Sequence, residues 1–207
     1  MRCFIIALAL TAMSACSYNV QPTSAPAVNV YSSYDEKIPG NWAVVIDEDT
    51  TVINREISPS SYVCSAHNYP FSTGNTMTVS IQRTMSQIFE ETVNRSMIPS
   101  IDEMTKSMMD GYVFVRLDSF SPRLSCSTGW WSAKCTSTVD LSFGIEAREV
   151  NGDKFATSVG STKSFDGDGG GACGEASSIL AEAYRLALKD AMERLAERAS
   201  NSTRLRD

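Results

Sequence analysis

At positions 137–150 the chain reads STVDLSFGIEAREV. Apolar residues stand at every second position from Val139 to Ala147, which is the pattern of a β-strand with one buried face and one face in water. Asn151 and Gly152 follow, and this pair favours a tight hairpin turn because both residues adopt positive φ at low cost. The stretch therefore predicts an antiparallel sheet that is covered on one side only.

Further strands are predicted on both sides of this stretch. Residues 154–164 are rich in Ser and Thr, so we expect them to form the returning strand at an edge of the sheet. Upstream, residues 112–120 alternate between the two faces, and Pro122 is expected to end that strand. Residues 41–46 and 51–57 are expected to form a first pair of strands.

Two main helices are predicted to cover the sheet. Residues 75–97 place apolar side chains at spacings of two to four, which gives one apolar face, and Pro99 ends the segment. Residues 175–199 carry Leu and Ala on one side and charged residues on the other, and the alanines allow a close approach to a sheet. A short helical piece between these helices begins with a capping box formed by Ser100 and Glu103.

The predicted order of elements is β-β-α-β-β-β-α. We therefore expect an α+β fold in which an antiparallel sheet of about five strands has two main helices packed on one face. The chain has 207 residues, of which 43% are hydrophobic, and this is enough for one core. A single globular domain is expected over residues 41–200, followed by a polar tail at 201–207.

The N-terminal residues have the features of a secretory signal. A basic residue precedes an apolar run over residues 4–10, which is too short to cross a bilayer core of about 30 Å. Residues 13–16 read MSAC and resemble the lipobox of bacterial lipoproteins, a family that favours Leu where this chain has Met13. The resemblance implies that residues 1–15 are removed as a signal peptide and that Cys16 is acylated.

The same resemblance implies a location. Asp directly after the acylated cysteine retains many Gram-negative lipoproteins in the inner membrane, and Ser17 therefore favours the outer membrane, periplasmic face. Residues 16–40 are then the lipidated cysteine and a flexible tether rich in Pro and Ser. The alternative is cleavage after Ser14, because Ala12 and Ser14 have the spacing of an ordinary cleavage site. That cleavage would give a soluble periplasmic protein with a free thiol at Cys16.

Four other cysteines remain in the exported chain. An even number in an oxidising compartment indicates two disulfides, for which three pairings are possible. Cys126 and Cys135 bracket a potential hairpin tip, so we favour a disulfide between them. Cys64 and Cys173 each precede a predicted helix and form the second pair. Metal binding by Cys64 and His67 is the weaker alternative, because it lacks a second close pair of ligands.

The loop between Cys126 and Cys135 contains Trp130 and Trp131. Two indoles at the tip of a hairpin would face water, and exposed aromatic residues cluster at binding sites and membrane interfaces. We therefore expect Trp130 and Trp131 to contact a partner. The alternative is that one or both fold back onto the sheet.

Composition and motifs argue against several classes of function. A net charge of −6 argues against binding to nucleic acid and against electrostatic attraction to anionic lipid. The one histidine, His67, belongs to no hydrolase motif, so we expect it to have a local structural role. Glycine-rich residues 166–171 lack the ligand pattern of a calcium loop or a P-loop and are expected to be a flexible connection. No catalytic residue, metal or cofactor is predicted.

The sequence thus favours a non-enzymatic, periplasm-facing lipoprotein that serves as an assembly, transport-accessory or scaffold component of a cell-envelope complex. Its expected partners are the membrane, through the N-terminal lipid, and an envelope protein. One alternative is a module that binds lipid or glycan between the helices and the sheet. A peripheral hydrolase is a further alternative. The order of elements is similar to that of small envelope lipoproteins, which is a likeness of architecture alone.

Overall fold

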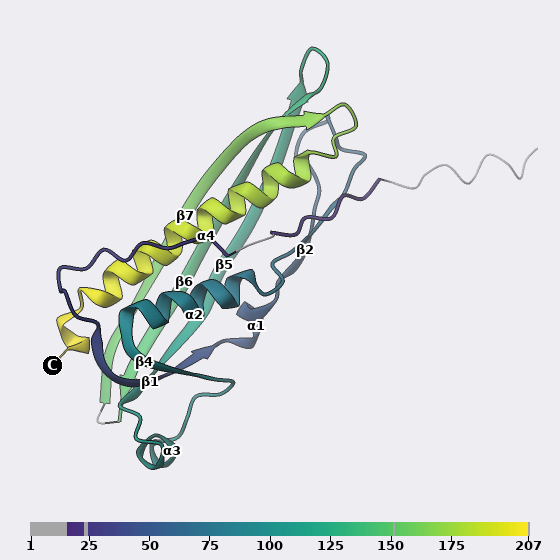
Figure 1. The fold of residues 1–207 in the computed structure, drawn as a ribbon. Coiled ribbons are helices and arrows are strands. Elements are labelled where there is room, and N and C mark those ends of the chain that lie inside the picture. The colour runs from purple at the N-terminus through teal and green to yellow at the C-terminus, as the bar shows by residue number, and fades with distance from the viewer. Residues whose placement is uncertain (1–15, 23–24, 151, 207) are drawn as a thin grey trace, which may run out of the picture.

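Three long strands that follow one another along the chain form an antiparallel meander (Figure 1). The computed structural model describes residues 16–22, 25–150 and 152–206. The meander consists of β5 (Gly111–Thr128), β6 (Ala133–Glu149) and β7 (Gly152–Gly170). Beside β5, the strands β1 (Ile38–Ile46) and β4 (Phe89–Arg95) extend the sheet, which has the order β4-β1-β5-β6-β7. The predicted α+β class and a sheet of five strands are confirmed.

The central strand, β6, has the one-sided burial that its sequence predicts. Its alternate side chains from Val139 to Ala147 are at most 3% exposed. On the other face, Thr138 and Asp140 make hydrogen bonds to the polar side chains of β7. β7 returns antiparallel to β6 and lies at an edge of the sheet, as predicted. The turn residue Asn151 lies outside the described residues.

Two helices, α2 (Thr76–Ile88) and α4 (Ala176–Ser200), cover one face of the sheet (Figure 1). α4 lies over β6 and β7 and contacts α2 along its side. Ala183, Ala187 and Ala191 of α4 are fully buried. Because alanine has a short side chain, these residues let the helix backbone lie close to the strands, as the sequence predicts.

The sheet is mixed, which corrects the prediction of a purely antiparallel one. The segment predicted as one helix over residues 75–97 leaves the helix at Ile88 and becomes β4, which pairs with β1 in parallel. The ring of Phe89 is fully buried and lies 5.0 Å from the ring of Trp42. Burial of Phe89 against β1 therefore favours the strand, and the mixed spacing of apolar residues reflects a helix followed by a strand.

The predicted pairing of residues 51–57 with the first strand is wrong. A short helix, α1 (Glu48–Thr51), follows β1, and β2 (Asn54–Ile57) pairs instead with β3 (Tyr69–Ser72) in a separate antiparallel sheet. The reason is that α1 occupies the place where β1 would continue beside β5. The buried hydroxyl of Thr50 accepts a hydrogen bond of 2.8 Å from the backbone N–H of Leu117.

β5 continues past Pro122, where the sequence predicted its end. Pro122 lies opposite Val139 of β6, but β1 accompanies the other side of β5 only as far as Val115. Proline lacks a backbone N–H, and it is tolerated here because β5 has a sheet neighbour on one side only at this point.

The capping box predicted upstream of β5 is confirmed. Ser100 caps α3 (Ile101–Lys106), and its hydroxyl accepts a hydrogen bond from the backbone N–H of Glu103. In return, the backbone N–H of Ser100 donates to the carboxylate of Glu103 at 2.8 Å. The N–H and the hydroxyl of Ser100 both donate to this carboxylate and hold the pKa of Glu103 below its usual range, with Arg95 and Lys106 adding to the effect.

The segment before β1 lies against the domain and differs from the flexible tether expected over residues 16–40 (Figure 1). Val20 is buried, and its backbone N–H donates to the carbonyl of Pro70 at 2.8 Å. Further on, Asn29 bonds to Glu193 of α4. The segment is held because its backbone extends the small β2–β3 sheet and its apolar side chains reach the core.

The C-terminal tail is also folded onto the domain. A short 3₁₀ helix, η2 (Thr203–Leu205), buries Leu205, and the guanidinium of Arg206 lies 4.1 Å from the centre of the Tyr34 ring. The polar composition of residues 201–207 gave no sign of these contacts.

The alanine face of α4 provides a test of the packing. Ala187→Leu adds volume where the helix meets the sheet, so we expect it to lower the free energy of unfolding by about 1–3 kcal/mol, measured by urea denaturation. The exposed position Glu197 serves as the control, and Glu197→Leu is expected to change stability by less than about 0.5 kcal/mol. Equal effects of the two substitutions would contradict the close approach of α4.

Candidate functional site

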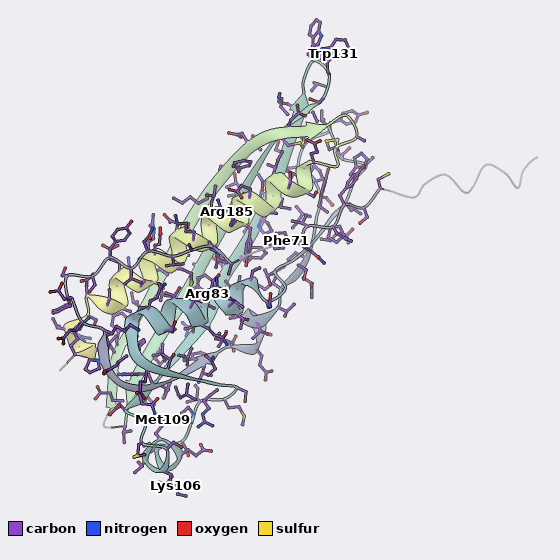
Figure 2. The ribbon with its side chains drawn as sticks, viewed as in Figure 1. Phe71, Arg83, Lys106, Met109, Trp131 and Arg185 are labelled. Atoms are coloured by element: carbon purple, nitrogen blue, oxygen red, sulfur yellow. A yellow bond between two sulfur atoms is a disulfide. The ribbon has the colours of Figure 1, made fainter. Side chains whose placement is uncertain are left out.

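The hairpin between β5 and β6 ends in two exposed indoles (Figure 2). The backbone N–H of Gly129 donates to the carbonyl of Ser132 at 2.8 Å, which closes a turn with Trp130 and Trp131 at its centre. Their side chains are 88% and 89% exposed, and their rings meet edge to face at 6.3 Å. The alternative that the indoles fold back onto the sheet is therefore wrong.

A disulfide between Cys126 and Cys135 lies just below this turn and joins opposite positions of β5 and β6. The hydroxyl of Ser132 donates to the carboxylate of Asp168 at 2.7 Å, and the ammonium of Lys134 lies 3.5 Å from the same carboxylate. The hydroxyl of Ser132 and the backbone N–H of Gly170 hold the pKa of Asp168 below its usual range. The tip is thus fixed both to its own hairpin and to the end of β7.

The glycine-rich stretch 166–171, predicted as a flexible connection, supplies the last residues of β7 up to Gly170. Thr136 bonds to Asp166, and Gly169 lies beside the disulfide of the hairpin. A Cβ on Gly169 would lie 2.6 Å from the Sγ of Cys135. The glycine is needed because the strand passes directly over this disulfide.

The second disulfide joins Cys64 to Cys173 and connects the loop after β2 to the residues before α4. The two disulfides are therefore those favoured from the sequence. The sulfur atoms of Cys64, Cys126 and Cys135 lie within 4.8 Å of one another. All three are in disulfides, so they cannot supply the thiolates that the alternative metal site would need.

Hydrogen bonds bring the start of the described chain to the same place. The hydroxyl of Tyr18 donates to the carbonyl of Ala172 at 3.0 Å, and the buried hydroxyl of Tyr69 donates to the carbonyl of Cys173 at 2.7 Å. Cys16, whose thiol is free and exposed, accepts a backbone hydrogen bond of 3.4 Å from Asn68.

The loop after β2 is fixed to β5 as well. The hydroxyl of Ser61 accepts a hydrogen bond of 2.7 Å from the backbone N–H of Cys126, and Ser60 donates to the carbonyl of Leu124. We call the four segments joined in this way the disulfide end, which comprises residues 16–22, 58–68, 125–133 and 169–174.

His67 lies within the disulfide end, with its ring 5.5 Å from the ring of Tyr18. Its Nδ1 atom is buried and has no hydrogen-bond partner among the described residues. The structure therefore places an aromatic ring, Tyr18, beside the histidine that any hydrolase hypothesis would use.

A second exposed surface, which sequence reasoning missed, surrounds α3 at the opposite end of the molecule (Figure 2). We call it the α3 patch, and it consists of Met97, Ile98, Ile101 and Met108, which are 48–84% exposed. Beside it is a surface hollow of about 450 Å³ lined in part by Met104 and Tyr112. The sequence does show apolar residues on both sides of Pro99, namely Met97, Ile98 and Ile101. The predicted helix over residues 75–97 assigned Met97 to a helix end, so the group was not recognised as one surface.

Within the described part of the chain, no helix has both the length and the apolar character needed to cross a bilayer.

No family model and no curated protein sequence matches the chain. A crystal structure of a Xanthomonas campestris protein from the DUF330 family is similar, with a TM-score of 0.49 and 9% identity over 86% of this chain and 91% of that one. A minor lipoprotein from Acinetobacter baumannii is similar with a TM-score of 0.40 and 9% identity, over 77% of this chain and 90% of that one. These likenesses are distant, so no residue role is taken from either protein.

The two disulfides are expected to differ in their effect on stability. They close segments with sequence separations of 109 and 9 residues, and a longer closed loop restricts the unfolded chain more strongly. We expect Cys64→Ala/Cys173→Ala to cost about 4–5 kcal/mol and Cys126→Ala/Cys135→Ala about 2–3 kcal/mol, measured by urea denaturation. The reverse order would show that native-state contacts of the hairpin outweigh loop closure.

Alkaline pH is expected to destabilise the disulfide end through Tyr69. Burial, with a smaller effect of Tyr18, raises the pKa of Tyr69 to about 12, whereas an unfolded tyrosine has a pKa of about 10. The free energy that the neutral, buried Tyr69 contributes to folding is therefore fully present below pH 10 and is lost as the pH rises toward 12. Tyr69→Phe should weaken this decline in denaturation experiments. Tyr62→Phe, at an exposed position, is the control and should leave the loss of stability at alkaline pH unchanged. The same loss of stability in Tyr69→Phe as in the unmutated protein would contradict the role of Tyr69.

Proposed function

We propose that this chain is a non-enzymatic lipoprotein of the cell envelope, anchored through Cys16 to the outer membrane with its domain facing the periplasm. In this proposal it serves as an assembly, transport-accessory or scaffold component. The observation that carries the proposal is the separation of two surfaces. The free thiol of Cys16 lies at the disulfide end, and the α3 patch lies at the opposite end of the long sheet.

The position of Cys16 supports lipid attachment. Its side chain is exposed, so a lipid on its sulfur would extend into the surroundings without disturbing the core. Residues 1–15, which contain the predicted signal peptide and the rest of the lipobox, lie outside the described residues.

The α3 patch supports a protein partner on the side away from the anchor. Exposed apolar side chains in a group mark interaction surfaces, and methionine is enriched at protein interfaces because its side chain adapts to different shapes. Met97 and Met108 are 74% and 84% exposed. Trp130 and Trp131, the partner contact expected from the sequence, lie at the anchor end, which makes the α3 patch the better placed surface for an envelope protein.

The packing of the core argues against the alternative of lipid or glycan binding between helices and sheet. The side chains of Ile81, Met85, Leu180 and Tyr184 in this layer are fully buried. They fill the space that such a ligand would occupy.

Lipid anchoring is tested by Cys16→Ala and by the signal peptidase II inhibitor globomycin. We expect both to block maturation, which is seen as retention of the signal peptide on immunoblots, and Cys16→Ala to remove the acyl mass from the N-terminus. Cys3→Ala is the matched control, since Cys3 belongs to the predicted signal peptide, and it should leave maturation unchanged. Unaltered processing after Cys16→Ala, with the unmutated protein and the variant both recovered in the soluble periplasmic fraction, would instead identify a soluble periplasmic protein.

The partner surface is tested by photo-crosslinking in cells. A benzophenone amino acid at Met97 or Ile101 is expected to give one discrete protein adduct, and Met97→Asp/Ile101→Asp should weaken that interaction at least about tenfold. The same probe at Tyr31, which is also well exposed, is the control and should give no such adduct. Adducts that appear equally at Tyr31 would argue against a specific α3 interface.

A further inference from the structure

Little free chain separates Cys16 from the folded domain. Ser17 pairs with Asn68, and Val20 is buried with its backbone bonded to Pro70 and Ser72 of the small sheet. If Cys16 carries a lipid, the bilayer surface must lie beside this segment, because the paired backbone allows the domain no long tether.

The indole tip projects from the same end of the molecule. Ser61 ties the loop beside Cys16 to Cys126, and the hairpin continues beyond the disulfide of Cys126 for about four residues to the tip. Since a strand rises about 3.3 Å per residue, the tip extends at most about 13 Å past this disulfide. Figure 2 shows Trp131 at the extremity of the molecule.

The surface between anchor and tip suits contact with a bilayer. The four segments of the disulfide end, all of which the structure describes, contain no Asp, Glu, Lys or Arg. Of the charged residues directly beside these segments, Lys134 and Asp168 pair with each other, and Glu175 is exposed next to Gly170. The exposed side chains include Tyr62 at 95%, together with Trp130 and Trp131. Tyrosine and tryptophan are favoured at the water–lipid interface, whereas charged side chains are costly there.

We propose that Trp130 and Trp131 insert into the interfacial region of the bilayer that holds the lipid on Cys16. The inference rests on the proposed anchoring at Cys16 and assigns the tip to lipid instead of a protein partner. The α3 patch provides the contrast, because it is aliphatic and is flanked by charged residues such as Asp102 and Lys106. The inserted tip adds a second point of attachment and thereby sets the orientation of the domain on the membrane.

The test uses the mature lipidated protein in vesicles of phosphatidylethanolamine and phosphatidylglycerol. The chain has three tryptophans, and the third, Trp42, is 1% exposed in the core, so it serves as an internal reference. When the acyl chains carry bromine, we expect the emission of Trp130 and Trp131 to fall at least by half and to shift to shorter wavelength. Trp130→Ser/Trp131→Ser should remove this quenching and leave the emission of Trp42.

A matched control places an indole at the other end. Met97→Trp, made in the Trp130→Ser/Trp131→Ser background, should be insensitive to brominated lipid and should be quenched by iodide in the buffer. Quenching of this control by lipid would overturn the proposed orientation.

The inference and the proposed anchoring fail in different ways. Mass spectrometry of the N-terminus reports the acyl groups on Cys16, and their absence overturns both. Acylated, vesicle-bound protein whose Trp130 and Trp131 remain accessible to iodide overturns only the inserted tip. Photo-crosslinking of the tip to an envelope protein, with no lipid quenching, would identify the indoles as a protein contact and also overturn the inference.

Discussion

The burial of one face of β6 beneath α4 is the constraint on which the other features depend. Val139, Leu141 and Phe143 lie in the same buried core as the alanines of α4, which packs on β6, while their neighbours on the strand face away. Side chains alternate along a strand, so a slip of one residue would turn every apolar side chain of β6 toward water. The pairing of β6 with both neighbours is therefore fixed over the whole length of the sheet, including the parts that extend past the helices.

This fixed register decides what each end of the sheet presents. It places Cys126 opposite Cys135, so that the hairpin closes with a disulfide below its tip. It also brings Gly169 over that disulfide, and the turn that leads into α4 then carries Cys173 to Cys64. The same core that orders the centre thus also orders the end of the molecule where Cys16, the indole tip and the joining loops lie.

The features that could be predicted are those with a local cause. β6 was recognisable from its period of two, and the α3 capping box from two residues three positions apart. The pairing of the disulfides followed from the loop that Cys126 and Cys135 enclose. β4 could not be recognised, because no Gly or Pro separates it from α2 and its partner β1 lies far upstream in the sequence. The contacts of residues 16–22 were hidden for a similar reason, since backbone hydrogen bonds to β3 leave no trace in a Pro- and Ser-rich composition.

The length of the sheet sets the distance between the two ends to which the proposals assign separate roles. β5 has 18 residues, and at about 3.3 Å per residue it spans about 60 Å. A domain held by Cys16 alone would pivot about that point, because a lipid on one residue fixes a position and not a direction. Under the proposed insertion, contact at the indole tip would restrict the pivot, and the exposed Tyr62 of the disulfide end would add a third point, so that an elongated body would keep one inclination to the membrane. The α3 patch would then be held at a constant height in the periplasm, where a partner embedded in the same envelope could meet it repeatedly in one orientation.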